Sequence, residues 1–177
     1  MTNIPPVHGT ETTFTGRAFA VRVDELEYAP GRRHRIEVVV HSGAVTMLPV
    51  EDGQIWFVRQ YRHPSGKILL ELPAGTLREG EDPALAAGRE LQEEIGQRAA
   101  SLTPLGSFWL APGYSTELMH AYLATGFTPD PLAQDEDEVI ELVKVPVAEA
   151  LALARSGQIQ DAKSLATLFL GLPLLVS

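Results

Sequence analysis

Residues 75–97 decide the fold, and they read Gly-Thr-Leu-Arg-Glu-Gly-Glu-Asp-Pro-Ala-Leu-Ala-Ala-Gly-Arg-Glu-Leu-Gln-Glu-Glu-Ile-Gly-Gln. This stretch predicts a helix over residues 83–95. Asp82 can cap its start, Pro83 suits its first position, and Gly96 suits the residue just past its end. Because the residues at both ends of the helix are identified, the positions of the strands before and after it in the sequence can be predicted.

Three carboxylates share one face of this helix. Glu90, Glu93 and Glu94 fall at positions i, i+3 and i+4, which brings their Cβ atoms within about 5–6 Å of one another. An isolated charge run of this kind is usually a solvated face, and like charges at this spacing weaken a helix. The competing interpretation is a metal site, because Mg²⁺ prefers oxygen ligands and is commonly held by carboxylates together with a substrate phosphate.

The spacing around these carboxylates favours the second interpretation. The stretch fits Gly-x5-Glu-x7-Arg-Glu-U-x-Glu-Glu-x-Gly-U, where U is a large aliphatic residue, and it resembles the Nudix box of nucleoside diphosphate hydrolases. The eight matching residues are Gly75, Glu81, Arg89, Glu90, Leu91, Glu93, Glu94 and Gly96. Average residue frequencies give such a match on the order of 10⁻⁹ per starting position by chance. Gln97 departs from the pattern, and because it follows the helix we expect altered packing there and no loss of chemistry.

The resemblance implies a ligand set for Mg²⁺, with Mn²⁺ as a substitute. Glu90 and Glu94 are the first ligands that it indicates, Glu93 is a third ligand or a catalytic carboxylate, and the carbonyl of Ala74 is a further ligand. The metal would neutralise a diphosphate and lower the pKa of an attacking water while a carboxylate removes its proton. The resemblance gives four other box residues structural roles: Gly75, Glu81, Arg89 and Gly96. Arg89 can pair with Glu81 or with Glu93.

Three further segments are similar to the ADP-ribose pyrophosphatase branch of the family. They are residues 57–62 (Phe-Val-Arg-Gln-Tyr-Arg), 71–75 (Glu-Leu-Pro-Ala-Gly) and 111–117 (Ala-Pro-Gly-Tyr-Ser-Thr-Glu), with Pro112 lying 15 residues beyond Gln97. This similarity implies Mg²⁺-dependent hydrolysis of ADP-ribose to AMP and ribose 5-phosphate. A GDP-sugar, NADH or a dinucleoside polyphosphate remains an alternative substrate. A domain that senses ADP-ribose without hydrolysing it is disfavoured, because every box carboxylate is present.

The same similarity assigns roles outside the box. The acidic run 135–138 matches a loop that supplies the general base, so Glu136 is the leading base, Glu138 is a candidate metal ligand, and Glu117 is a rival base. A solvated loop is the alternative for this run. Arg62 matches an arginine that contacts a substrate phosphate, a task that suits the fork of a guanidinium group.

Candidates for adenine recognition lie near the amino terminus. Arg33, Arg35 and Tyr28 are the candidates there, because the family commonly shares this region between the subunits of a homodimer. The alternative is that residues 32–35, Arg-Arg-His-Arg, are only the polar edge of a hairpin. Phe108 and Trp109 are expected in the core, because large aromatic side chains dominate core packing.

The predicted fold is a mixed α/β class, with a Nudix-like mixed sheet between helices and an antiparallel β region at the amino terminus. Residues 1–40 are expected to form that β region and to mediate dimerisation, and residues 41–177 to form the hydrolase domain of one compact unit. Helices are also expected at 147–156 and 162–171. The expected strands are 17–24, 35–41, 44–50, 54–61, 68–72, 102–110, 117–124 and 139–145, with Asp52-Gly53 as the strongest hairpin signal.

The composition of the chain restricts the kinds of molecule to which it can bind. The chain of 177 residues carries 23 acids, 14 bases and no cysteine, so a disulfide scaffold is excluded. A net charge of −9 disfavours nucleic acid and anionic membrane, and it favours a small nucleoside diphosphate bound through a cation. The apolar run 165–176 is shorter than the roughly 20 residues of a membrane helix. Residues 1–6 lack the features of a secretory signal, so a cytoplasmic location is expected.

Overall fold

A computed structural model describes residues 4–134 and 139–175 of the chain. The chain divides into two compact units. Unit 1 comprises Met1–Gly43 and Trp109–Leu118, and unit 2 comprises Ala44–Phe108 and Met119–Ser177. The division falls near residue 43, and it places the segment from 109 to 118 with the amino-terminal strands.

Unit 1 is a three-stranded antiparallel sheet in the order β1-β2-β3. Its strands are β1 (Val7–Thr15), β2 (Ala20–Ala29) and β3 (Arg32–Val40). The segment 109–118 joins this unit by main-chain hydrogen bonds, because Val39 N–H donates to the Tyr114 carbonyl over 2.7 Å and Thr116 N–H donates to the Val39 carbonyl over 2.9 Å.

Unit 2 is built on a seven-stranded mixed sheet. Its main path is β10-β5-β4-β9-β8, with β6 added to β5 and β7 added to β4. The β4 and β9 strands run parallel, and the hairpin between β4 and β5 is antiparallel. The strands are β4 (Ala44–Glu51), β5 (Gln54–Arg62), β6 (Lys67–Glu71), β7 (Ala74–Thr76), β8 (Gln97–Trp109), β9 (Leu118–Pro129) and β10 (Ile140–Pro146).

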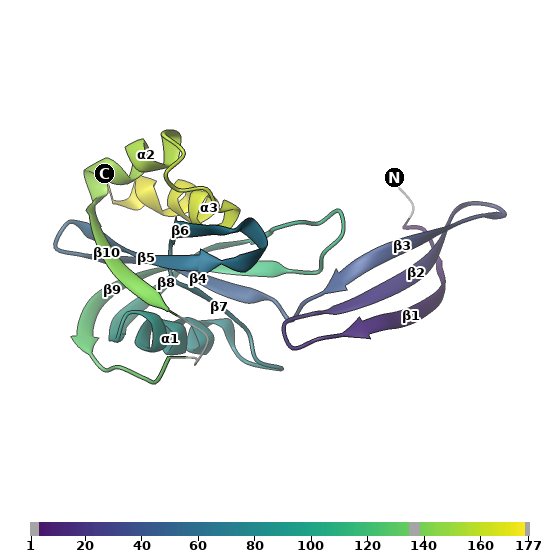
Figure 1. Cartoon of the computed structure of the whole chain (residues 1–177), viewed down its shortest axis with the longest axis horizontal. Coiled ribbons are helices and arrows are strands. Elements are labelled where there is room, and N and C mark those ends of the chain that lie inside the picture. Colours follow the sequence, from purple (N-terminus) through teal and green to yellow (C-terminus); the bar gives the residue numbers. More distant parts are fainter. Residues whose placement is uncertain (1–3, 135–138, 176–177) are drawn as a thin grey trace. The chain divides into compact units, whose positions relative to one another are not determined.

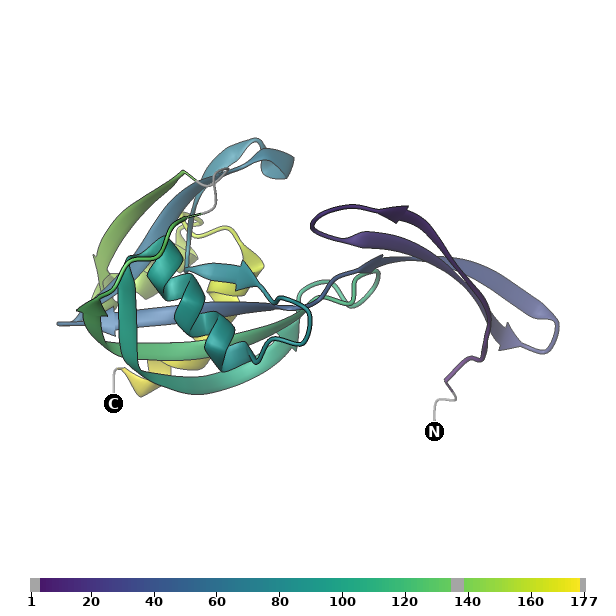
Figure 2. The same ribbon diagram turned by 90° about the horizontal axis from the view of Figure 1, so that it is seen from below.

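Helices cover both faces of this sheet. Figure 1 shows α1 (Pro83–Glu94) on one face, with α2 (Val147–Arg155) and α3 (Ala162–Gly171) on the other. The view from below in Figure 2 shows α1 lying across the strands. Two single-turn 3₁₀ helices, η1 (His63–Ser65) and η2 (Leu172–Leu174), complete the described elements. The predicted mixed sheet between helices is therefore confirmed.

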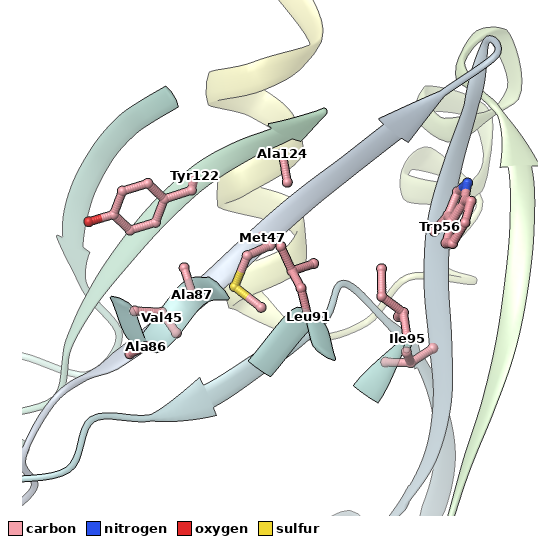
Figure 3. Close-up of a cluster of buried hydrophobic side chains, with 10 residues drawn as sticks. Val45, Met47, Trp56, Ala86, Ala87, Leu91, Ile95, Tyr122 and Ala124 are labelled. Atoms are coloured by element: carbon pink, nitrogen blue, oxygen red, sulfur yellow. The ribbon is translucent and has the colours of Figure 1, made fainter. Parts of the chain in front are cut away.

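The two helical layers each have a hydrophobic core. Alternate β4 residues point to opposite faces, so Val45 and Met47 pack beneath α1 whereas Leu48 packs with Leu168 of α3. Figure 3 shows the first cluster, in which α1 contributes short alanines beside larger side chains. Its buried members are Val45, Met47, Trp56, Val58, Ala86, Ala87, Leu91, Ile95, Tyr122 and Ala124. Small residues on α1 let the helix lie close to the sheet.

Local signals in the sequence correspond to local geometry. The Asp82 side chain accepts hydrogen bonds from the N–H groups of Ala84 (2.8 Å) and Leu85 (3.2 Å), so the expected N-cap is confirmed. The turn between β4 and β5 has positive φ at both central residues, 50° at Asp52 and 72° at Gly53. This is the backbone of a type I′ hairpin, which Asp-Gly favours.

Two features of the strands differ from the expectations. The strand β1 was not predicted, because its sequence Val-His-Gly-Thr-Glu-Thr-Thr-Phe-Thr is mostly polar and every residue in it is exposed. Trp109 was expected in the core but is 54% exposed. It is the last residue of β8, and β8 ends the path of the larger sheet. Within residues 4–134 and 139–175, every helix is too short or too polar to cross a membrane.

Candidate active site

Arg89 ties the loop before α1 to the helix itself. Its guanidinium donates to both carboxylate oxygens of Glu81, from Nε over 2.9 Å and from Nη2 over 3.0 Å. Its Nη1 donates to Glu90 over 2.6 Å and to Glu93 over 2.8 Å. Arg89 thus contacts the two partners that the sequence indicates, and Glu90 in addition. These contacts fix the loop of the box against the face that carries its carboxylates.

The electrostatics of this cluster follow from the arginine. Hydrogen bonds from Arg89 hold the pKa of Glu81 below its usual value, against the smaller effect of burial. Hydrogen bonds to Glu81, followed by the charges of Glu90 and Glu93, raise the pKa of Arg89. Arg78 also approaches Glu93, with 3.8 Å between Nη2 and Oε1. Acidic side chains outnumber the arginines here, which is the charge balance that a divalent cation requires.

Glu90 and Glu94 are the two buried carboxylates of the helix, with 8% and 4% of their surface exposed. Each lies against the strand β7. The main-chain N–H of Ala74 donates to Glu94 Oε2 over 3.0 Å. A Cβ added to Gly75 would overlap the whole carboxyl group of Glu90. Glycine at position 75 is therefore required because the carboxylate of Glu90 occupies the space beside the main chain.

These residues fit a divalent metal. Buried carboxylates are tolerated when they are paired or coordinate a metal, and Glu90 and Glu94 stand one helical turn apart on the same face. Within the described residues, no group of three or more His, Asp or Glu side chains could hold a metal by itself. A Mg²⁺ site of the kind that uses one or two carboxylates, waters and substrate phosphates needs no such group.

Arg62, at the end of β5, contacts a buried carboxylate. Its Nε donates to Glu71 Oε1 over 3.1 Å and its Nη2 donates to Glu71 Oε2 over 2.9 Å. Glu71 is 2% exposed and also contacts Lys163 of α3. Sequence reasoning used Glu71 only as part of a motif and missed Lys163 altogether. The one signal for Lys163 was its place in the first turn of the helix expected at 162–171.

The candidates for adenine recognition lie on β2 and β3 of unit 1, whereas the box lies in unit 2. Arg33 is within 3.5 Å of Glu25, and Arg35 is within 3.7 Å of Glu11. Tyr28 is 60% exposed and meets the ring of His34 edge-on, with 5.7 Å between centroids. These arginines thus make ion pairs across the strands of their own sheet.

The candidate bases are placed as follows. Glu117 belongs to unit 1, where its N–H donates to Ser115 Oγ over 3.1 Å and its carbonyl accepts from Leu110 N–H. Glu136 and Glu138 lie outside the described residues. The chain that precedes them is fixed to the end of α1, because Gln92 Nε2 donates to Asp130 Oδ2 over 2.6 Å.

Comparison with known proteins decides the family. The NUDIX domain family matches residues 40–168, which is more than half of the chain. The chain belongs to the Nudix family. Among its Nudix relatives, the ADP-ribose pyrophosphatase of Bacillus subtilis (strain 168) is 38% identical over 157 residues, which cover 87% of this chain and 85% of the relative.

Two further Nudix comparisons agree. The ADP-ribose pyrophosphatase of Mycobacterium tuberculosis (strain ATCC 25618 / H37Rv) is 40% identical over 161 residues, covering 89% of this chain and 78% of the relative. A crystal structure of an ADP compounds hydrolase superposes with a TM-score of 0.88 at 29% identity, covering 99% of this chain and 96% of the other. The expected membership of the Nudix family is confirmed.

Proposed function

We propose that this Nudix protein hydrolyses the pyrophosphate bond of ADP-ribose to AMP and ribose 5-phosphate, with Mg²⁺ as its metal and Mn²⁺ as a substitute. One observation carries the proposal. Two buried carboxylates, Glu90 and Glu94, face the main chain at Ala74 and Gly75 in a chain that is 38–40% identical to two ADP-ribose pyrophosphatases.

In this proposal, different residues bind the metal, orient the carboxylates and contact the substrate. Glu90 and Glu94, with the carbonyl of Ala74, would hold the metal, and Glu93 would be a catalytic carboxylate or a third ligand. The bound ion would neutralise the diphosphate and activate a water. Arg89 keeps three of the box carboxylates oriented through hydrogen bonds of 2.6–3.0 Å. Arg62 contacts a substrate phosphate in this proposal, and Arg33, Arg35 and Tyr28 serve the adenosine part.

The proton of the attacking water needs a base. We assign it to Glu136, with Glu138 as a further metal ligand and Glu117 as the rival base, on the resemblance of the acidic run 135–138 alone. Replacing Glu136 by Gln should lower kcat about 100-fold with little change in metal affinity. An unchanged kcat there, together with a large loss in Glu117→Gln, would transfer the role to Glu117.

The oligomeric state, the cellular location and the partners of the protein are also proposed. A homodimer formed through residues 1–40, a cytoplasmic location and the absence of nucleic-acid partners remain predictions from the sequence. The exposed strand β1 supports the first of these, because all nine of its residues are accessible in the single chain. Sedimentation analysis that shows a monomer at working concentration would contradict the dimer.

The decisive experiment combines a substrate panel with two substitutions. Purified protein is assayed with Mg²⁺ or Mn²⁺ on ADP-ribose, GDP-mannose, NADH and a dinucleoside polyphosphate. Glu90→Gln and Glu94→Gln should each lower kcat by about 100-fold or more while the protein stays folded. Glu79→Gln is the matched control, because Glu79 is an exposed box residue outside the matching positions.

The outcomes separate the alternatives. Preference for ADP-ribose with both losses supports the proposal, and wild-type rates in either glutamine variant would refute the ligand assignment. A similar rate on several ADP-containing compounds would favour a broader substrate class, in keeping with the structural neighbour described as an ADP compounds hydrolase. Absence of turnover on the whole panel would favour a sensor of ADP-ribose.

A further inference from the structure

A buried network of charges on unit 2 is built around Glu71, which precedes the first box residue, Gly75, by four positions. Glu71 is the last residue of β6, and its side chain is 2% exposed. Both of its oxygens accept hydrogen bonds from Arg62, and Oε2 also contacts the ammonium group of Lys163. A carboxylate so deeply buried is stable only when it is paired and hydrogen-bonded, and here two cations from different elements supply the pairing.

Lys163 reaches Glu71 from the first turn of α3. Its side chain is 11% exposed, and its Nζ lies 2.9 Å from Asp161 Oδ2. The same Asp161 oxygen caps α3 by accepting from the N–H of Ser164 over 2.9 Å. Ser164 Oγ accepts in turn from Leu72 N–H over 2.7 Å. The first turn of α3 is therefore fixed to two successive residues at the end of β6.

This network sets the charge and orientation of Glu71. Burial alone would raise the pKa of Glu71, but hydrogen bonds from Arg62 and the charge of Lys163 outweigh it and hold the pKa below its usual value. Glu71 is therefore an anion at neutral pH. Its two oxygens present a fixed pair of acceptors to the planar guanidinium of Arg62, a bidentate geometry that restricts the arginine more than a single bond would.

The network is connected to the box through one short segment. Glu71 precedes Gly75 by four residues, so their Cα atoms are separated by no more than about 14 Å of chain. Within that segment Ala74 N–H binds Glu94, and Gly75 lies against Glu90. The strand that orients Arg62 thus continues directly into the main chain that contacts the two buried carboxylates.

We propose that Glu71 and Lys163 are positioning residues, which hold the guanidinium of Arg62 in place for a phosphate of the substrate. The proposal rests on the proposed function, in which Arg62 contacts that phosphate. Lys163 acts only through Glu71 and Arg62. Without the ammonium group, Glu71 Oε2 loses one of its partners and the carboxylate can turn, so the arginine is held less firmly.

The test is a double-mutant cycle on KM. Lys163→Met should raise KM for ADP-ribose about tenfold with kcat within about twofold of wild type, because an interaction with bound substrate is weakened. Lys163→Arg, which keeps the charge, should restore KM to within about threefold. In an Arg62→Gln background, Lys163→Met should have no further effect on KM, because the residue through which it acts is already gone.

Lys67→Met is the matched control. Lys67 lies directly opposite Arg62 in the β5–β6 register, and its Nζ contacts Gln160 at 3.4 Å. Its removal takes away the same charge near Arg62 without touching Glu71, so KM should stay within about twofold of wild type. An equal rise of KM in Lys67→Met would show a general charge effect and would overturn the positioning role.

The remaining outcomes are equally decisive. An unchanged KM in Lys163→Met, or an equal rise of KM in the Arg62→Gln background, would refute the positioning role. Melting temperatures are measured for every variant, and Lys163→Gln replaces Lys163→Met if the latter does not fold. Absence of wild-type turnover of ADP-ribose would instead refute the proposed function, so the two failures are distinguishable.

Discussion

Two glycine-to-alanine substitutions within the box test whether the position of Glu90 matters for turnover. At Gly75, an added Cβ would lie closer than 3.0 Å to the Cδ and both oxygens of Glu90, and ordinary contact begins at 3.4 Å. To reach ordinary contact the carboxylate would therefore have to move by more than about 1 Å, and a misplacement of about 1 Å can already cost roughly 100-fold in rate. Gly88 of α1 has nothing within 4 Å of the same added atom.

The two variants should diverge in both stability and activity. Gly75→Ala should lower kcat about 100-fold. Because Glu90 is 8% exposed and bonded to Arg89, the crowding should also lower the free energy of unfolding by about 1–3 kcal/mol. Gly88→Ala should leave kcat unchanged and raise the free energy of unfolding by roughly 0.5–1 kcal/mol, because alanine is favoured over glycine inside a helix.

The assays are steady-state hydrolysis of ADP-ribose and urea unfolding followed by circular dichroism. The two measurements separate a displaced carboxylate from a general loss of folding. Wild-type kcat in a folded Gly75→Ala protein would refute the reasoning, because the carboxylate would then be free to move without consequence. An equal loss of kcat in Gly88→Ala would also refute the reasoning, because this substitution does not crowd Glu90.

Three further predictions concern capping, pH and metal. Asp82→Ala should lower the free energy of unfolding by about 1 kcal/mol, measured in urea, because the cap of α1 is lost. The pKa of Glu71 is lower in the folded protein than in the unfolded chain. Its contribution to the free energy of unfolding is therefore complete above the unfolded pKa of about 4.3, and it is lost as the pH falls through the folded pKa. Urea unfolding from pH 6 downward should therefore show a shallower decline in Glu71→Gln, and an identical decline would contradict this. Removing divalent ions with EDTA should abolish turnover, and added Mg²⁺ should restore it; turnover that survives chelation would exclude a metal requirement.

The elements whose boundaries depend on neighbouring residues could be predicted. The start of α1 at Pro83 follows from Asp82, which satisfies the first N–H groups, and its end follows from Gly96, whose φ of 69° suits a residue without a side chain. The hairpin at Asp52 was predicted for the same reason. In each case the deciding interaction lies within a few residues of the signal.

Features that depend on distant residues could not be predicted. Lys163 meets Glu71 across 92 residues of chain, and nothing in the sequence near either residue indicates the other. The strand β1 is specified by pairing with β2 and not by its own apolar pattern, since its residues are all exposed. Trp109 was wrongly expected in the core because the sequence does not show whether other elements cover the last residue of a strand.

The segment from Glu71 to Gly75 limits where this chain can change length. Each of its five residues has a different partner: Arg62, Ser164, Met47, Glu94 and Glu90, in that order. Inserting or deleting one residue within the segment would shift its later residues relative to its earlier ones. The contact with Arg62 at the start of the segment and the contacts with Glu94 and Glu90 at its end could then not form together. Insertions should instead be tolerated at the exposed turn of Asp52 and Gly53, where the change stays local.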